Sequence, residues 1–379
     1  MLFFFVKSLF KPKLDSLNTI QIHRANILHN LEVLQNLQPE SAIFPVLKSN
    51  AYGHGLKEVA TILKSIDLPY ICVDSVPEYY LVKKFAKKRS LIIGETLPSN
   101  YKKLHHKRAT PCIYTLASLQ ALIESWKPWK IHLFLNTWMN REWIQYHELW
   151  GFLELLQWSK IELEWVMSHF ANADEVDSNF CLDQIAEFKQ MYSMIEQYGF
   201  TPKYKHIANT AWIAKIQDPF FTASRTWIGL FGYSPLVKED PSYDKLASLK
   251  PSLDVKTTLV SMQRIKSGDI ASYGGTFIAN QDTTVATLPF GYTEGLSRSL
   301  RGKRHVMWQE KELPVIGTIC MNLCIIDTLW ENIKVGDQVT IISSNLQHPN
   351  TIQEFAKLSG TINYEVLVNL DPKARRTIV

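Results

Sequence analysis

Short apolar runs recur along the first two thirds of the chain, and segments with helical periodicity separate them. In Phe180–Tyr198 and Ala117–Trp126, apolar residues three and four positions apart predict helices with one buried face. The runs that predict buried strands are Ala42–Lys48, Tyr70–Asp74, Leu91–Gly94, Cys112–Tyr114, Ile131–Asn136, Leu163–His169, Tyr204–Asn209 and Trp227–Phe231. Eight strands alternating with helices favour a (β/α)8 TIM-type barrel over an open doubly wound sheet, because the GxGxxG turn of the latter is absent.

The pattern changes after about residue 245. Turn residues then break up strand-like runs, which are Val255–Ile265, Thr283–Pro289, His305–Gln309, Leu313–Ile319, Cys324–Leu329 and Gln338–Ile342. One helix is expected over Ile352–Leu358, closed by Gly360. The sequence therefore predicts an α/β barrel over residues 14–245 and a mainly β C-terminal domain over 246–379, preceded by a tail of residues 1–13.

Composition and charge narrow the class of protein. With 46% apolar and 20% charged residues, the chain has the composition of a soluble globular protein. The net charge of +5 is mild, and its densest basic stretch, Lys83–Arg108, is interpreted as a solvated helix face, because no aromatic or glycine pattern for base stacking accompanies it. We therefore expect no nucleic-acid partner.

Cysteines and apolar segments give no sign of export or of a membrane. The five cysteines are scattered, with no CxxC and no Cys/His spacing suited to a metal site, which fits reduced thiols in a cytoplasmic protein. The apolar start of the chain is interrupted at Lys7 and lacks the features of a signal peptide. No later run approaches the roughly 20 apolar residues of a membrane helix.

Barrel enzymes carry their chemistry at the carboxyl ends of the strands, and this rule selects residues here. Lys48, His169 and the pair Asn209–Thr210 end predicted strands, and Arg141 follows another. Arg225 does not fit the rule, because it precedes the last predicted strand.

Lys48 closes the apolar run that starts at Ala42. Burial at a strand end favours the neutral amine and so lowers the lysine pKa towards useful nucleophilicity. The loop Ser49–Gly55 follows, with two glycines and the phenol of Tyr52, and such a loop can approach a phosphate closely.

The run PVLKSNAYGHG around Lys48 resembles the cofactor-lysine signature of alanine racemases, whose usual form is VVKADAYGHG. The remaining motifs follow in the family's order, and any one alone would be weak. They are LFLNTWMNR with Arg141, SHFANAD with His169, KHIANTA with His206, Asn209 and Thr210, RTWIGLFG with Arg225, ASYGGT with Tyr273, GYTEG, ICMNLCIID with Met321, and INYEVL with Tyr364.

The resemblance implies a fold-type III barrel that holds pyridoxal 5'-phosphate on Lys48. It also implies interconversion of L-alanine and D-alanine by two bases, Lys48 on the D-face and Tyr273 on the L-face, with His169 assisting the tyrosine. Arg225 would face the pyridine nitrogen, supported by His206. The other implied cofactor contacts are Tyr52, Asn209, Thr210, Trp227, Ile228 and Tyr364.

The amino-acid substrate is expected to contact Arg141, Met321 and Tyr273, with no metal involved. The family is homodimeric, so each active site would combine the barrel of one subunit with Tyr273 and Met321 of the other. Racemisation of another amino acid, or of several, is the first alternative function. A decarboxylase, a non-catalytic cofactor-binding protein and a nucleic-acid binder are weaker alternatives, because none of them explains the ordered Tyr273, Met321 and Tyr364 motifs.

The chain departs from the family pattern at several positions. Phe134 stands where the family commonly has a carbamylated lysine beside the active-site arginine, so we expect Asn136 or a chloride to offset Arg141. Trp138 and Trp227 replace glycines. Glu294 and Asn322 replace aspartates. These changes affect the expected substrate more than the expected reaction.

Overall fold

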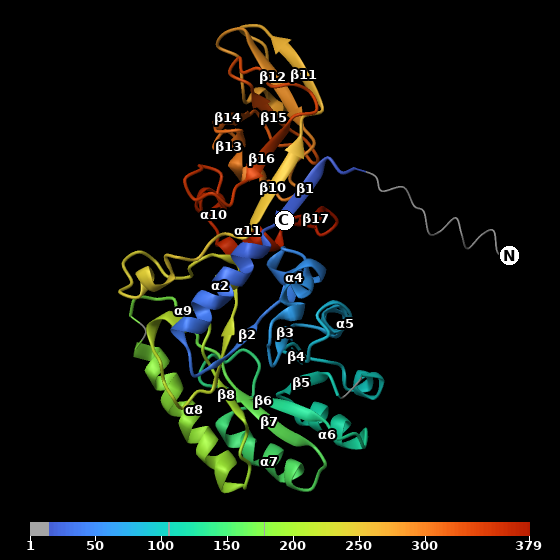
Figure 1. The fold of residues 1–379 in the computed structure, drawn as a ribbon, viewed down its shortest axis with the longest axis vertical. Coiled ribbons are helices and arrows are strands. Elements are labelled where there is room, and N and C mark those ends of the chain that lie inside the picture. Colours follow the sequence, from blue (N-terminus) through green and yellow to red (C-terminus); the bar gives the residue numbers. More distant parts are fainter. Residues whose placement is uncertain (1–14, 105–106, 178) are drawn as a thin grey trace, which may run out of the picture. The chain divides into compact units, whose positions relative to one another are not determined.

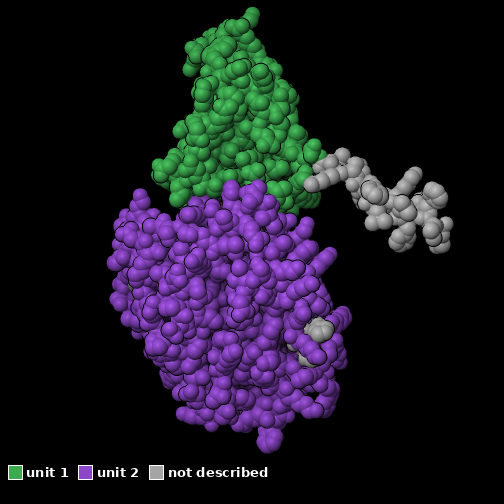
Figure 2. Space-filling model, viewed as in Figure 1, with its two compact units in different colours: residues 1–21, 254–362, 369–377 green, residues 22–253, 363–368, 378–379 purple. Residues whose placement is uncertain are grey.

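The structure is a computed structural model that describes residues 15–104, 107–177 and 179–379. Two compact units are present, coloured separately in Figure 2. The barrel unit contains residues 22–253, 363–368 and 378–379, and the β-rich unit contains residues 15–21, 254–362 and 369–377. Short segments from near both ends of the chain thus belong to a different unit from their neighbours in sequence. The predicted tail, residues 1–13, lies outside the described residues.

Eight parallel strands form the barrel unit's core (Figure 1). They are β2 (Ala42–Pro45), β3 (Ile71–Val73), β4 (Ser90–Ile92), β5 (Ala109–Ile113), β6 (Lys130–Phe134), β7 (Glu162–Met167), β8 (Tyr204–His206) and β9 (Ala223–Thr226). Strands β3 to β8 pair in chain order, and β2 pairs with β9. A bridge between Val46 and Cys72 joins β2 to β3, and the Arg225 amide donates to the Ala208 carbonyl beside β8. The ring is therefore closed, which confirms the predicted (β/α)8 barrel.

Helices connect these strands, as the periodicity predicts. They are α2 (Arg24–Leu37), α3 (Lys48–Tyr52), α4 (Leu56–Ile62), α5 (Val76–Phe85), α6 (Leu116–Glu124), α7 (Leu149–Gln157), α8 (Asn179–Gln197) and α9 (Thr210–Lys215), with the 3-10 turns η1 (Leu63–Ser65), η2 (Pro98–Lys103), η3 (Tyr146–Glu148), η4 (Ile228–Phe231) and η5 (Tyr243–Leu246). Buried residues of α8, such as Ile185, Phe188 and Ile195, recur three to seven positions apart, so one face of the helix packs inward.

The last barrel strand was placed wrongly by the sequence pattern. The expected strand Trp227–Phe231 is the 3-10 turn η4 preceded by Trp227, and the true strand is β9. The sequence Ala-Ser-Arg-Thr of β9 looks polar, yet all four residues are buried, and hydrogen bonds within the barrel engage both Nη atoms of Arg225. Arg225 consequently lies near the carboxyl end of a strand, where the rule for barrel enzymes places functional residues.

A buried acid, Glu164 of β7, anchors the interior of the barrel unit. Its carboxylate accepts hydrogen bonds from the Tyr70 hydroxyl, from Arg89 (Nη1–Oε1 3.1 Å) and from Lys130 (Nζ–Oε1 3.1 Å), and only 6% of its surface is exposed. Burial raises the Glu164 pKa, but the bonds from Tyr70 and Arg89 outweigh burial and leave the pKa below its usual range. The folded state thus favours the charged carboxylate.

We expect Glu164→Gln to lower the free energy of unfolding at pH 7 by about 2 kcal/mol, because it removes the buried charge that accepts hydrogen bonds from Tyr70 and from the partly exposed Arg89 and Lys130. The folded-state pKa is depressed, so the charge contributes fully above the unfolded pKa of about 4.3 and is lost as pH falls through the folded value. Urea unfolding at pH 7 and near pH 3 should show the two proteins converging in acid. Glu162→Gln is the control: its side chain is 58% exposed, and its loss should cost at most about 1 kcal/mol. An equal deficit at both pH values would contradict this account.

The β-rich unit is built around a nine-stranded sheet whose order is β11-β12-β15-β14-β13-β16-β10-β1-β17. The strands are β1 (Asn18–Ile22), β10 (Leu253–Thr258), β11 (Ser261–Ile265), β12 (Thr283–Leu288), β13 (His305–Trp308), β14 (Lys311–Ile316), β15 (Cys324–Asp327), β16 (Gln338–Ile342) and β17 (Arg375–Ile378). Two 3-10 turns, η6 (Tyr273–Gly275) and η7 (Arg298–Leu300), and the helix α10 (Ile352–Ser359) complete it. The mainly β C-terminal domain is therefore confirmed.

Several details of this unit differ from the sequence prediction. The run Val255–Ile265 is two strands, because the chain leaves β10 at Leu259 and then pairs β11 with β12 instead of β16. Strands β1 and β17 and the helix α11 (Asn363–Val368) were not predicted, since each is short and has no clear periodicity. Helix α10 ends at Gly360 as expected, with φ 69° in the left-handed region.

Candidate active site

The predicted residues Lys48, His169, Asn209 and Arg225 all lie at the carboxyl-terminal ends of barrel strands. Lys48 follows β2, His169 follows β7, Asn209 follows β8, and Arg225 belongs to β9. Because the strands are parallel, these ends share one rim of the barrel. The structure thus brings together residues that are up to 177 positions apart (Lys48 to Arg225) in the sequence.

The turn after Lys48 is left-handed. Ser49, Asn50, Ala51 and Tyr52 have φ values of 51–56°. Such a turn costs L-residues about 1–2 kcal/mol each, so its surroundings must hold it. Asn50 supplies part of this support, because its Oδ1 accepts from the Leu56 amide at 2.8 Å and its carbonyl accepts from the Gly55 amide at 2.9 Å.

Gly53 ends the left-handed turn with φ 77°. A Cβ atom at this position would lie 1.9 Å from the carbonyl oxygen of Leu367 in α11, so only glycine allows the helix to approach so closely. The turn that presents Lys48 and Tyr52 is therefore fixed by a segment near the C-terminus of the chain.

The Lys48 amine is half-buried at the start of the turn. Burial is the main cause that lowers its pKa, and the charge of Asp74 offsets part of this effect. Its Nζ lies over the indole of Trp227, 4.8 Å from the ring centroid. The amine is consequently neutral more often than a surface lysine, as a nucleophile or base requires.

Tyr52 offers a buried hydroxyl group that has no partner in the described part of the chain. The residue is 3% exposed, its OH makes no hydrogen bond to these residues, and its ring contacts Tyr364 of α11 at a centroid distance of 5.9 Å. Burial raises the pKa of Tyr52 well above its usual value and also raises that of Tyr364. Both phenols therefore remain neutral donors. A buried hydroxyl without a partner is costly, and a ligand oxygen would satisfy it.

Arg225 is a buried cation, and no described residue forms a salt bridge with it. It is 1% exposed, and its Nη2 donates to the Ser168 carbonyl at 2.6 Å and lies 3.2 Å from Nδ1 of His169. Its Nη1 bonds to Nδ1 of His206. Burial lowers the Arg225 pKa to about 10, which still leaves the guanidinium charged at neutral pH.

The two histidines beside Arg225 are neutral. Burial lowers the pKa values of His169 and His206 well below the usual range, and the charge of Arg225 lowers them further. The Nδ1 atom of His206 can therefore accept from Arg225, as its predicted supporting role requires. The imidazole of His169 stacks on Trp227 with a centroid distance of 4.8 Å and an interplanar angle of 5°.

Three predicted cofactor contacts have local hydrogen bonds in the structure. Asn209 caps α9, since its Oδ1 accepts from the Trp212 amide at 3.1 Å. The buried Thr210 hydroxyl accepts from the Trp227 amide at 3.0 Å. Thr210 also packs against Gly229, where a Cβ atom would lie 2.5 Å from its methyl group. These contacts join the start of α9 to the turn η4, which begins at Ile228.

The surroundings of Arg141 differ from the expectation. Asn136 donates to Asn140 (2.7 Å) and to Gln145 (2.9 Å), whereas Arg141 pairs with Glu142 (Nε–Oε1 3.5 Å) and is 52% exposed. Phe134, at the position of the family lysine, stacks on the ring of Trp143 at 4.2 Å. Glu142 was not among the predicted residues, although an acid directly after the arginine is visible in the sequence.

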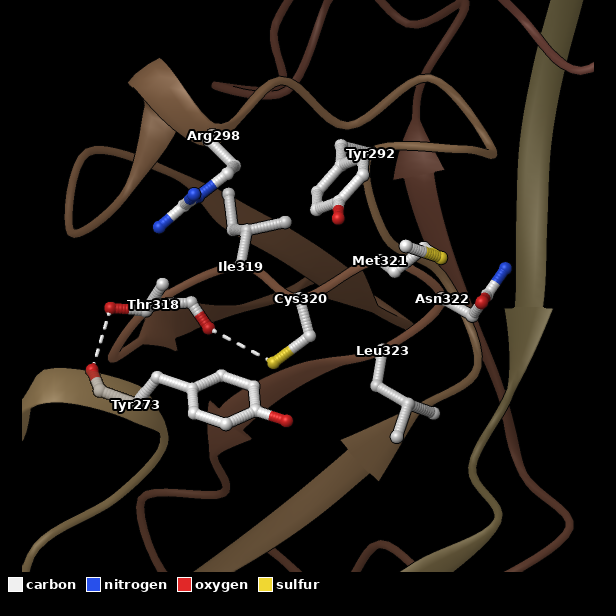
Figure 3. Close-up of a pocket in the computed structure, with 9 residues that line it drawn as sticks. All are labelled: Tyr273, Tyr292, Arg298, Thr318, Ile319, Cys320, Met321, Asn322 and Leu323. Atoms are coloured by element: carbon white, nitrogen blue, oxygen red, sulfur yellow. Dashed lines mark hydrogen bonds between the residues drawn. The ribbon is translucent and has the colours of Figure 1, made fainter.

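The β-rich unit carries its own pocket of about 400 Å³, which contains Tyr273 and Met321 (Figure 3). Tyr273 is 73% exposed and Met321 56%, so both side chains are available for contact. The Tyr273 carbonyl accepts from the Thr318 hydroxyl at 2.8 Å, and the Ser272 hydroxyl donates to the Thr318 carbonyl at 2.6 Å. These bonds fix the turn that presents the tyrosine.

Glu294 and Asn322, two positions that depart from the family pattern, contact each other beside Met321. The Asn322 amide donates to Glu294 Oε1 at 2.9 Å, and the other oxygen of Glu294 accepts from the Gly291 amide at 2.8 Å. The Glu294 carboxylate, which is one carbon longer than the family's aspartate, therefore accepts from the neutral amide of Asn322, where the family has a second aspartate. The Met321 carbonyl accepts from the Thr293 amide at 3.1 Å, so this network holds the loop.

Fold and site together define a two-domain class, in which a (β/α)8 barrel with a rim lysine is followed by a β-rich domain with an exposed tyrosine. Comparison with known proteins identifies the class more closely. Residues 22–235 match the N-terminal domain model of alanine racemase, and residues 252–378 match its C-terminal domain model. The chain belongs to the alanine racemase family.

Relatives of known name cover almost the whole chain. It is 32% identical to the alanine racemase of Carboxydothermus hydrogenoformans, over 95% of this chain and 98% of that protein. Alanine racemase 1 of Clostridium acetobutylicum is 29% identical, over 95% and 94%. The solved structure of alanine racemase from Clostridium difficile 630 has a TM-score of 0.90 and 28% identity, over 97% of each chain. That from Bacillus anthracis has a TM-score of 0.88 and 27% identity, over 97% and 96%.

Two further observations concern metals and membranes. Among the described residues, no group of three or more His, Cys, Asp or Glu side chains could hold a metal ion. In the same part of the chain, no helix is long and apolar enough to span a membrane.

Proposed function

We propose that this protein interconverts the L- and D-enantiomers of alanine with pyridoxal 5'-phosphate as its cofactor. One observation carries the proposal: Lys48, whose pKa burial lowers, lies at the same barrel rim as the buried guanidinium of Arg225. Membership of the alanine racemase family supports the choice of reaction and substrate. One related solved structure, that from Bacillus anthracis, has L-Ala-P bound.

The side chains of the barrel rim fit this cofactor. Lys48 would hold its aldehyde carbon, and Arg225 would donate to the pyridine nitrogen, where the absence of a carboxylate suits an unprotonated ring. The unpartnered Tyr52 hydroxyl fits a phosphate oxygen. Thr210, Tyr364 and the backbone around Trp227 and Ile228 would complete the phosphate site, with Asn209 supporting it through the cap of α9. Neutral donors and amides are sufficient for a phosphate.

When bound, the cofactor supplies a ring that delocalises the electron pair left at Cα after the proton has been removed. The residues of this chain remove that proton and return it on the opposite face of Cα. We assign Lys48 to the D-face and Tyr273 to the L-face, because racemisation needs one base on each side. A free phenol has a reference pKa of about 10 and is a weak base at neutral pH, so Tyr273 needs a neighbour, and we assign this role to His169.

The second base is assigned to a second copy of the chain. We propose a homodimer in which Tyr273 and Met321 of the partner subunit complete the site of each barrel. The exposure of both side chains in the pocket of Figure 3 supports this assignment, since an unshared tyrosine base would be expected to be buried. Arg141 and the Met321 amide would bind the substrate carboxylate, with Glu142 balancing the arginine charge.

Borohydride treatment of the protein with pyridoxal 5'-phosphate should fix the cofactor onto Lys48. We expect one stoichiometric tag there by peptide mass spectrometry, because its lowered pKa leaves more neutral amine than an exposed lysine has. Lys48→Ala should abolish the tag and the yellow colour, whereas Lys84→Ala, on the exposed side of α5, should change neither. A tag on a different lysine would contradict the proposed site.

A further inference from the structure

Trp227 contacts two of the groups on which the proposed function depends. Its indole stacks on the imidazole of His169, with a centroid distance of 4.8 Å and an interplanar angle of 5°. The Lys48 Nζ lies over the same indole, 4.8 Å from its centroid. The corresponding position in the family motif is a glycine, which has no side chain to make this contact.

The indole is held by stacking, without a hydrogen bond. Its Nε1 atom is buried and has no hydrogen-bond partner among the residues that the structure describes. The parallel arrangement with His169 and the cation–π contact with Lys48 are both favourable, so the indole stabilises the arrangement in which it covers these two residues. Displacing it therefore costs free energy.

The cofactor needs the same surface. Its aldehyde carbon is attached directly to an aromatic ring, so a cofactor joined to Lys48 Nζ must place that ring beside the amine. If the nitrogen of that ring faces Arg225, the ring must also lie beside His169, because the Arg225 Nη2 atom lies 3.2 Å from His169 Nδ1. The indole and the cofactor ring cannot fill one volume.

We propose that the Trp227 indole competes with the cofactor for the surface formed by Lys48 and His169, and that it must leave for the cofactor to bind. The proposal rests on the proposed function only in taking pyridoxal 5'-phosphate as the ligand. The backbone of Trp227 can stay in place during this change, because its amide is held by Thr210 at 3.0 Å. Rotation of the side chain about its own bonds is then sufficient.

The test compares cofactor affinity in Trp227→Gly, Trp227→Phe and the native protein, by absorbance titration with pyridoxal 5'-phosphate. We expect the dissociation constant to fall about tenfold or more in the glycine variant, a change of about 1.4 kcal/mol. The smaller phenylalanine should give an intermediate value, and it keeps the test valid if the glycine variant does not fold. Trp126→Gly is the matched control: this indole is 82% exposed in the loop before β6, and its φ of 56° suits glycine. Its affinity should equal the native value.

The result also separates this inference from the proposed function. Equal binding by Trp227→Gly, with normal binding by the native protein, would overturn only the competition. Weaker binding would also overturn it and would show that the indole supports the cofactor. Binding by Trp227→Gly alone would support the competition strongly. If no variant forms an adduct that depends on Lys48, both the inference and the proposed cofactor are wrong.

Discussion

Mixing Lys48→Ala chains with Tyr273→Ala chains should restore about a quarter of native racemase activity, although each variant alone should be nearly inactive. The expectation follows from the proposed dimer, in which each site takes Lys48 from one chain and Tyr273 from the other. In a mixed dimer, one site has both defects and the other has none. Random assortment makes about half of the dimers mixed, so about a quarter of all sites are intact.

The measurement requires subunits that exchange. The two variants should be mixed under mild denaturation, returned to native buffer and assayed with L-alanine by chiral chromatography. Differently tagged copies, purified through both tags, provide the control, because such a sample contains only mixed dimers and should reach about half of native activity. No recovery in doubly purified dimers would show that both bases belong to one chain.

Tyr273→Phe should slow proton exchange from L-alanine far more than from D-alanine. A positioned base contributes roughly 10²- to 10⁴-fold to a proton transfer, and the phenylalanine keeps the ring while removing the hydroxyl. Lys48 remains available on the opposite face, so exchange at the D-enantiomer should persist. Lys48→Ala should abolish exchange from both enantiomers, because it also removes the attachment of the cofactor.

Exchange is followed by NMR in deuterated water, with each enantiomer in a separate reaction. Tyr80→Phe, on an exposed part of α5, serves as the control for loss of a hydroxyl and should leave both rates unchanged. Equal losses from the two enantiomers in Tyr273→Phe would exclude the assignment of Tyr273 to the L-face.

The barrel and its rim were largely predictable because they follow from local periodicity and the order of the strands. The positions of Lys48 and His169 at the ends of predicted strands follow from the sequence pattern alone, without the family resemblance. Arg225 was misplaced relative to its strand for a physical reason. Apolarity is the usual sign of burial, whereas β9 buries polar residues, among them Arg225, whose two Nη atoms bond to His206 and Ser168.

The hydrogen-bond and ion-pair partners of individual side chains were harder to predict than the places of the residues along the barrel strands. Asn136 or a chloride was expected to offset Arg141, and the Asn136 amide is engaged by Asn140 and Gln145. Glu142 pairs with the arginine instead, and this depends on the loop conformation after β6, which no periodicity encodes. The stacking of Trp227 on His169 likewise joins residues 58 positions apart that share no pattern.

The contact between Gly53 and Leu367 also affects the order in which parts of the chain can fold during translation. The left-handed turn after Lys48 is unfavourable by itself, and one of the surfaces that hold it, α11, is encoded more than 300 residues later. All eight barrel strands have been translated by residue 226, so a ribosome must still add residues 227–368 before this surface exists. A nascent chain can therefore assemble its barrel strands long before it can complete the turn that presents Lys48 and Tyr52.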